Sequence, residues 1–149
     1  MANPSSATEF TIDVTDLKTL ARDLRKIQPE LAKELRVGLK QVAEPVRATA
    51  ELLVGAVTKK AAGPIVTRTS GVTVKVVNKS THPLAGLFEY GNKGQRGAAT
   101  FRHPVFGNTD VWVTQKTHPY LSRALAIRQD QVVRGFVDLV GRVLEKVNL

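Results

Sequence analysis

The sequence predicts an α+β protein, in which a small antiparallel β-sheet packs against a long N-terminal helical region and a C-terminal helix. Two long stretches, over residues 17–57 and 120–147, place apolar side chains at helical spacing. The segments before and between them either alternate apolar and polar residues or are rich in β-branched residues, as strands are. This order of strand, helices, strands and helix favours a layer of helices on one antiparallel sheet.

Length and composition limit the classes of protein to consider. A chain of 149 residues, 42% hydrophobic and 23% charged, can bury one core, so we expect a single α+β domain over residues 10–149. Residues 1–9 are mostly small and polar and predict a flexible tail. The absence of cysteine excludes disulfides and thiolate metal sites and fits synthesis in a reducing cytoplasm. Because the sequence has no signal-peptide pattern and no long apolar run, we expect no membrane partner.

The first predicted elements are a short strand and a helix. Phe10–Val14 alternates apolar and polar residues, the two-residue period of a strand with one buried face. Thr15 or Asp16 can then cap a helix, because a short side-chain oxygen accepts a hydrogen bond from a free backbone N–H. Helical spacing of apolar residues continues from there to Ile27.

A second, longer helix is predicted to follow at once. Pro29 disfavours helix at the preceding residue but suits the first turn of a new helix, so we expect a break between the two. Pro45 should bend this helix without ending it, and Gly63 with Pro64 should terminate it. At 1.5 Å per residue, residues 31–60 would extend roughly 45 Å, and we expect so long a helix to contact neighbouring subunits too.

The middle of the chain has the pattern of strands. Ile65–Arg68 and Val72–Val77 are rich in β-branched residues and flank a turn at Ser70 and Gly71, which predicts a β-hairpin. Leu84–Tyr90 is a mixed run that fits either a short helix or a short strand.

A glycine-rich loop over residues 91–97 separates this region from the last elements. Phe101–Phe106 and Val111–Val113 are predicted strands joined by a turn. Pro119 suits the first turn of the last helix, which Tyr120 opens and whose apolar face continues to the end of the chain.

The charge balance indicates an anionic partner. The net charge is +9 and the sequence pI is about 10.2, which attracts nucleic acid, anionic surfaces or acidic proteins. The sequence has no helix-turn-helix, aromatic RNA-binding or zinc pattern, and aromatic residues make up only 5% of it. Sequence-specific recognition is therefore not expected, whereas unspecific contact with phosphates stays open.

No residue pattern indicates catalysis, a metal or a cofactor. Each of the three histidines precedes a proline, and their wide separation gives none of the usual metal-ligand spacings: His82, His103 and His118. The serines lack a nucleophile-elbow context, and the glycines of residues 91–97 lack the Lys-Ser/Thr pair of a phosphate-binding loop. We therefore expect no enzymatic activity and no cofactor.

The candidate contact residues gather around the glycine-rich loop instead. Lys93 and Arg96 lie in the loop and could reach a neighbouring subunit or DNA. Arg102, His103 and Trp112 lie on the strands predicted after it. We expect these side chains to contact another copy of the chain or a partner.

Two segments resemble a family of tail components of long-tailed bacteriophages. Leu87–Asn92 is similar to an aromatic, Glu, aromatic, Gly segment of that family. His118–Leu125 is similar to a Pro, aromatic, Leu, x, x, Ala, Leu segment that enters its final helix. Asn92, where many relatives have Thr or Ser, and a longer stretch over residues 102–112 depart from the family pattern. The matching residues are Phe88, Glu89, Tyr90, Gly91, Pro119, Tyr120, Leu121 and Leu125.

These matching residues also have packing roles. If Leu84–Tyr90 is a strand, Phe88 and Tyr90 share one face and Glu89 points to the other. Leu121 and Leu125 would begin the buried stripe of the last helix.

The resemblance implies a virion structural protein of the phage neck or upper tail, made in the host bacterial cytoplasm. Such a head–tail connector joins the head-completion proteins to the tail tube during virus assembly and completes the tail as a subunit of a ring, expected to be hexameric. Its partners would be further copies, neighbouring neck and tail proteins and, without sequence specificity, passing DNA. Two alternatives stay open: a tail terminator that caps the tail tube, and a non-specific nucleic-acid-binding module.

Overall fold

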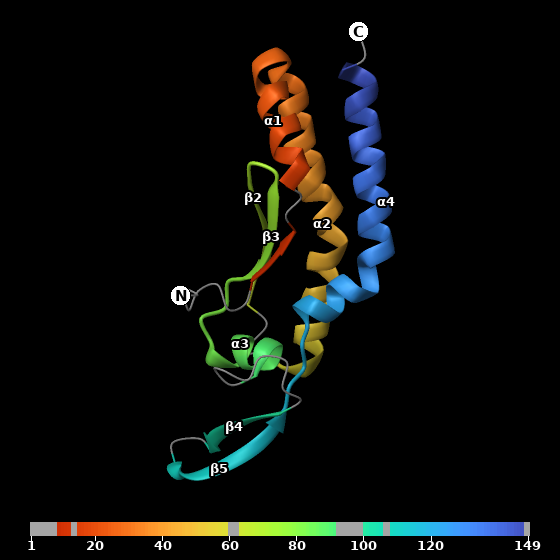
Figure 1. Ribbon diagram of the computed structural model, residues 1–149. Coiled ribbons are helices and arrows are strands. Elements are labelled where there is room, and N and C mark those ends of the chain that lie inside the picture. The colour runs from red at the N-terminus through yellow and green to blue at the C-terminus, as the bar shows by residue number, and fades with distance from the viewer. Residues whose placement is uncertain (1–8, 13–14, 60–62, 92–99, 106–107, 148–149) are drawn as a thin grey trace.

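The structure is a computed structural model that describes residues 9–12, 15–59, 63–91, 100–105 and 108–147 (Figure 1). Its helices and two small antiparallel sheets confirm the α+β class. The predicted tail lies outside the described residues, except that Glu9 begins the first strand. The elements in chain order are β1 (Glu9–Ile12), α1 (Thr15–Ile27), α2 (Pro29–Val57), β2 (Ile65–Ser70), β3 (Thr73–Asn78), α3 (Pro83–Tyr90), β4 (Thr100–Val105), β5 (Asn108–Lys116) and α4 (Leu121–Val147).

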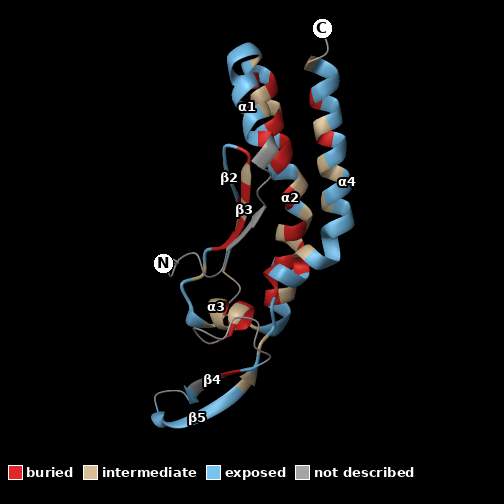
Figure 2. Ribbon diagram, viewed as in Figure 1, coloured by how far each residue is buried: buried red, intermediate tan, exposed pale blue. Residues whose placement is uncertain are grey.

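Helix α2 lies at the centre of the molecule. The three-stranded sheet lies on one side of it and α4 on the other, while α1 packs against its first half (Figure 1). Burial is concentrated along α2, whereas much of α4 is exposed (Figure 2). The buried residues of α2 recur every three or four positions, which places them on one broad stripe: Leu31, Leu35, Gly38, Leu39, Ala43, Val46, Thr49, Ala50 and Val54.

The break before α2 is confirmed. Helix α1 ends at Ile27, Gln28 leaves the helical conformation with φ −141° and ψ 79°, and α2 begins at Pro29. Because proline lacks a backbone N–H, its place in the first turn leaves no donor unsatisfied. The helix then continues through Pro45, as predicted.

The predicted end of α2 at Gly63 and Pro64 is wrong. The helix ends at Val57, because Thr58 adopts an extended backbone with φ −161° and ψ 133°. Extended backbone suits a β-branched residue, and the N–H of Thr58 still donates to the carbonyl oxygen of Val54 at 3.0 Å. The helix therefore stops without a glycine.

The strands form two sheets. The first has the order β1-β3-β2, with Phe10 and Thr67 both paired to Val76 from opposite sides. The β2–β3 hairpin is confirmed, and its turn contains Gly71 at a φ of 60°, a conformation that glycine adopts without strain. The second sheet is a ribbon of β4 and β5 that extends away from the helices (Figure 1). We call it the β4–β5 ribbon.

Helices α2 and α4 run antiparallel and are joined at both ends. Near one end, Lys146 Nζ lies 2.8 Å from Glu34 Oε1. Near the other, Arg128 Nε donates to Thr49 Oγ1 at 2.9 Å. These contacts fix the register of the two helices, although the exposed ion pair adds little stability by itself.

Between these ends the two helices approach closely at Gly38. A Cβ atom placed on Gly38 would overlap the side chain of Leu139 in α4, which is itself buried. The missing side chain therefore allows Leu139 to pack directly on the backbone of α2. Gly55, in the same helix, is exposed and would place its Cβ in open space.

This difference predicts opposite effects of one substitution at two positions of α2. Gly38→Ala should destabilise the protein by about 1–2 kcal/mol, because an overpacking cost of about 1–3 kcal/mol exceeds the helix-propensity gain. Gly55→Ala should stabilise it by about 0.5–1 kcal/mol, because only the gain applies there. Urea unfolding of both variants measures the change, and equal stabilisation at both positions would contradict the close packing of Leu139.

Candidate functional site

The structure brings the two segments of the phage-tail resemblance together. Residues 88–91 lie at the end of α3, and residues 119–125 lie at the start of α4. They contact each other through hydrogen bonds between Glu89 and backbone groups that follow it by 31 to 33 residues. We call this contact region, residues 85–91 and 118–125, the α3–α4 junction.

Glu89 is the central residue of the junction. Its Oε2 accepts hydrogen bonds from the backbone N–H groups of Tyr120 and Leu121, both at 2.7 Å, and its Oε1 accepts one from the N–H of Ser122 at 3.0 Å. The first N–H groups of a helix have no acceptor within the helix, and a negative charge beside them interacts favourably with the helix dipole. A side chain of α3 therefore caps α4.

The burial of Glu89 makes this cap stronger than an exposed one. The residue is 7% exposed, and within the described residues no cation pairs with it. A buried carboxylate without such hydrogen bonds would be strongly unfavourable. The start of α4 and the charge of Glu89 therefore stabilise each other.

Tyr120 connects the junction to the three-stranded sheet. Its hydroxyl donates to the carbonyl oxygen of Ala85 at 3.0 Å and accepts from Asn78 Nδ2 at 2.9 Å. Asn78 ends β3, and its Oδ1 accepts from the backbone N–H of Ser80 at 2.9 Å. Burial raises the pKa of the Tyr120 hydroxyl, so this buried donor stays protonated well beyond the usual range.

Phe88 connects the junction to the β4–β5 ribbon. Its ring makes edge contacts with Phe101 in β4 and with His118, at centroid distances of 5.7 and 5.8 Å. The carbonyl oxygen of Phe88 also accepts from the backbone N–H of His118 at 3.0 Å. Because Phe101 lies near the start of β4 and His118 just follows β5, both strands of the ribbon are held at the end where it joins the body.

Gly91 ends α3 in a conformation that other residues rarely adopt. Its φ is 78°, and its N–H donates to the carbonyl oxygen of Leu87 at 2.8 Å. A side chain at this φ would strain the backbone, which explains the glycine of this segment.

The alternative of a strand over Leu84–Tyr90 is wrong, because α3 occupies these residues. Pro83 lies in the first turn of α3, and His82 Nδ1 accepts a hydrogen bond from the N–H of Leu84 at 3.2 Å. Both residues therefore stabilise the start of this helix. Glu89 therefore does not point away from Phe88: both side chains are buried, Phe88 against the ribbon and Glu89 against α4.

The predicted position of Pro119 in the first turn of the last helix is also wrong. Helix α4 begins at Leu121, and the carbonyl oxygen of Tyr120 accepts the first helical hydrogen bond, from the N–H of Ala124 at 3.0 Å. Pro119 is exposed and precedes this capping position. Leu121 begins the buried face, as predicted, and Leu125 packs against the core while partly exposed.

Three residues in the junction or in contact with it have no sequence signal that identifies their roles. Asn78 reads as a turn residue, and His118 reads only as a chain break before proline. Phe101 reads as one apolar residue of a strand. Their partners lie far away in the sequence, 42 residues in the case of Asn78 and Tyr120, so no local pattern reveals them.

The predicted contact residues lie in the other part of the candidate site. Arg102 and Trp112 are exposed on the β4–β5 ribbon, and His103 belongs to β4. Lys93 and Arg96 lie outside the described residues. The structure therefore places three of these five residues on one projecting element.

The ribbon exposes an unusual amount of apolar surface. Trp112 is 51% exposed, and its neighbours Val111 and Val113 are 46% and 38% exposed. Trp112 Nε1 donates to the carbonyl oxygen of Thr109 in the same strand at 2.9 Å, which ties the indole to the backbone of β5. Successive side chains of a strand point to opposite faces, so Trp112 lies on one face of the ribbon and the two valines lie on the other. A two-stranded ribbon without further cover is only marginally stable in water, so these exposed faces are suited to contact other molecules.

The described residues provide no other chemical centre. Among them, no group of three or more His, Cys, Asp or Glu side chains is placed to hold a metal ion. Within the same part of the chain, no helix combines the length and the apolar character needed to cross a bilayer.

Comparisons of the chain with protein-family models, curated proteins and solved structures find no match.

The junction predicts a large effect of Glu89→Gln. The substitution removes the negative charge and replaces one acceptor oxygen by an NH2 group that would face a backbone N–H. We expect a loss of about 2–3 kcal/mol in the free energy of unfolding, measured with urea. Glu34→Gln is the matched control, because it breaks only the exposed pair with Lys146 and should cost less than about 1 kcal/mol. Similar losses in both variants would contradict a capping role for Glu89.

Tyr120 predicts a loss of stability at alkaline pH. Because burial raises its pKa in the folded state, the folded protein holds this proton to a higher pH than the unfolded chain does. The contribution is complete below the ordinary tyrosine pKa of about 10 and is lost as the pH rises from there towards the folded value.

Tyr120→Phe removes this titration together with two hydrogen bonds, so it should cost about 1–3 kcal/mol at neutral pH. The difference in unfolding free energy between the natural protein and the variant should shrink as the pH passes about 10. Urea unfolding at a series of pH values measures it. A difference that stays constant would show that the hydroxyl is not held protonated by the fold.

Proposed function

We propose that this protein is a structural subunit of the neck or upper tail of a long-tailed bacteriophage and has no enzymatic role. In the virion it joins head-completion proteins to the tail tube as part of an oligomeric ring. The observation that carries the proposal is the α3–α4 junction, because the two segments of the resemblance form one packed unit. Glu89 of the first segment caps the helix that the second segment begins.

This contact makes the resemblance more informative than two short matches. Phe88, Glu89 and Gly91 perform three different tasks at one place: packing against the ribbon, capping α4 and turning the chain. Tyr120 fills the same region with a fully satisfied buried hydroxyl. The likeness therefore falls on residues that depend on one another, which supports a shared architecture.

The β4–β5 ribbon supports assembly into a ring. A ring requires a surface on one copy that fits a different surface on the next copy. The ribbon projects from the body and carries Trp112 and Arg102, two residue types enriched where protein contacts are strongest. A net charge of +9 suits acidic neighbours or DNA passing through the ring.

The test is a deletion of the gene in the phage that carries it, followed by electron microscopy of the particles. We expect filled heads and tails of normal length that do not join. Tails of uncontrolled length would assign the chain to the tail terminator instead, because that protein stops growth of the tube. Intact infectious particles would overturn any neck or tail role.

Complementation of this deletion tests the ribbon. Trp112→Glu should fail to restore joined particles, because a charge at the centre of an apolar contact costs binding energy. The control is Leu52→Glu, which adds the same charge at an exposed leucine of α2. Restoration by both variants would contradict the ribbon as the contact surface, provided that both proteins melt at the temperature of the natural chain.

A further inference from the structure

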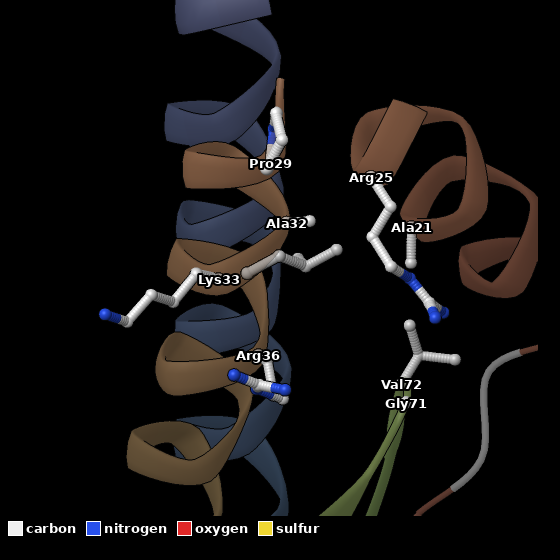
Figure 3. A pocket seen from close by; sticks show the side chains of 9 residues that line it. Ala21, Arg25, Pro29, Ala32, Lys33, Arg36, Gly71 and Val72 are labelled. Atoms are coloured by element: carbon white, nitrogen blue, oxygen red, sulfur yellow. The ribbon is translucent and has the colours of Figure 1, made fainter. Parts of the chain in front are cut away.

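A pocket of about 280 Å³ lies where the end of α1, the start of α2 and the turn of the β2–β3 hairpin meet (Figure 3). The break at Gln28 separates the two helix axes, and Gly71 and Val72 of the hairpin turn line the pocket from the other side. A Cβ placed on Gly71 in that turn would meet no atom within 4 Å. The pocket is therefore formed by the way α1, α2 and the hairpin turn are arranged around it.

Cationic side chains surround this pocket. Arg25 comes from α1, and Lys33 and Arg36 come from α2, while no Asp or Glu is among the lining residues. In Figure 3 the Arg25 side chain extends towards Val72, whereas Lys33 points away from the pocket. Within the described residues neither Arg25 nor Arg36 forms an ion pair, so both guanidinium groups are available to a ligand.

The pocket is apolar beneath these cations. Ala21, Leu35 and Val72 line it and are buried, and Ala32 lines it while partly exposed. Beside it, at the end of α1, Ile27 is 72% exposed. The volume of the pocket falls just below the roughly 300–1,000 Å³ of typical small-molecule sites. The pocket therefore suits one large side chain better than a cofactor.

The geometry points to a protein partner: we infer that this pocket binds an acidic segment that inserts one apolar side chain. Guanidinium groups bind carboxylates with paired hydrogen bonds, so Arg25 and Arg36 at the edge of the pocket would bind the acidic residues of the segment. An inserted apolar side chain accounts for the walls, because it removes their surface from water.

Nucleic acid fits the same pocket less well. Phosphates would satisfy Arg25 and Arg36, but a sugar–phosphate backbone has no apolar group that projects into the space beside Leu35 and Val72. The pocket lies on a different element from the β4–β5 ribbon, so the inference goes beyond ring assembly and does not require a phage neck.

The test measures fluorescence anisotropy of a labelled peptide in which four aspartates flank one phenylalanine, with the full chain at low salt. Arg25→Gln combined with Arg36→Gln should weaken binding at least about tenfold, since two charge-assisted contacts are lost. The control is Arg123→Gln combined with Arg142→Gln, two exposed positions of α4, which makes the same change in net charge and should leave binding unchanged.

Ala32→Leu tests insertion without changing charge, because it fills the pocket from a helix position that tolerates leucine. It should reduce the affinity for this peptide to that for a peptide with alanine in place of phenylalanine. A single-stranded thymidine oligonucleotide is the competing probe. Absence of peptide binding would overturn the inference. So would an Ala32→Leu variant that binds peptide and oligonucleotide as the natural chain does, because the arginines would then be an unspecific cationic surface. Melting temperatures confirm that each variant is folded.

Discussion

The carboxylate of Glu89 decides where α4 begins, and much of the structure depends on that point. Its three backbone hydrogen bonds fix the first turn of α4 on the end of α3. A helix of 27 residues then extends from this turn along α2, where the contacts of Arg128 with Thr49 and of Lys146 with Glu34 fix its register. Since Phe88 precedes Glu89 and holds both strands of the β4–β5 ribbon at one end, the same junction also orients the ribbon. One short segment therefore positions the last helix and the projecting strands together.

A second constraint is the central position of α2. The sheet covers one side of this helix and α4 the other, so its apolar stripe must be wide and its contacts must be close. Gly38 allows such a close contact, because it has no side chain at the point where Leu139 packs on the backbone of α2. Within the described residues, no element covers the outer side of α4, where Ile127, Val133 and Val137 are exposed. The described residues are thus well packed around α2 and carry apolar surface at their periphery.

The two candidate contact surfaces differ in chemistry and in place. The ribbon offers Trp112 and flanking valines on a projecting element, whereas the pocket at the α1–α2 corner combines arginines with an apolar interior. Both surfaces are exposed, whereas the side chains that hold the elements in position at the α3–α4 junction are buried: Phe88, Glu89 and Tyr120. The buried contacts of the junction therefore fix how the ribbon and the last helix are placed relative to the body.

The sequence by itself determined the class of fold, the helix break at Pro29, the β2–β3 hairpin and the buried stripe of α4, because each follows from local spacing or from the backbone chemistry of one residue. It did not determine that Leu84–Tyr90 is a helix, where α2 ends, or that the strands separate into a sheet and a ribbon. Tertiary structure alone decided the partners of Glu89 and Tyr120, since their hydrogen bonds join groups 31 to 42 residues apart. A local pattern can show that a residue is polar, but only the folded chain brings the acceptor to the free N–H groups that make its burial favourable.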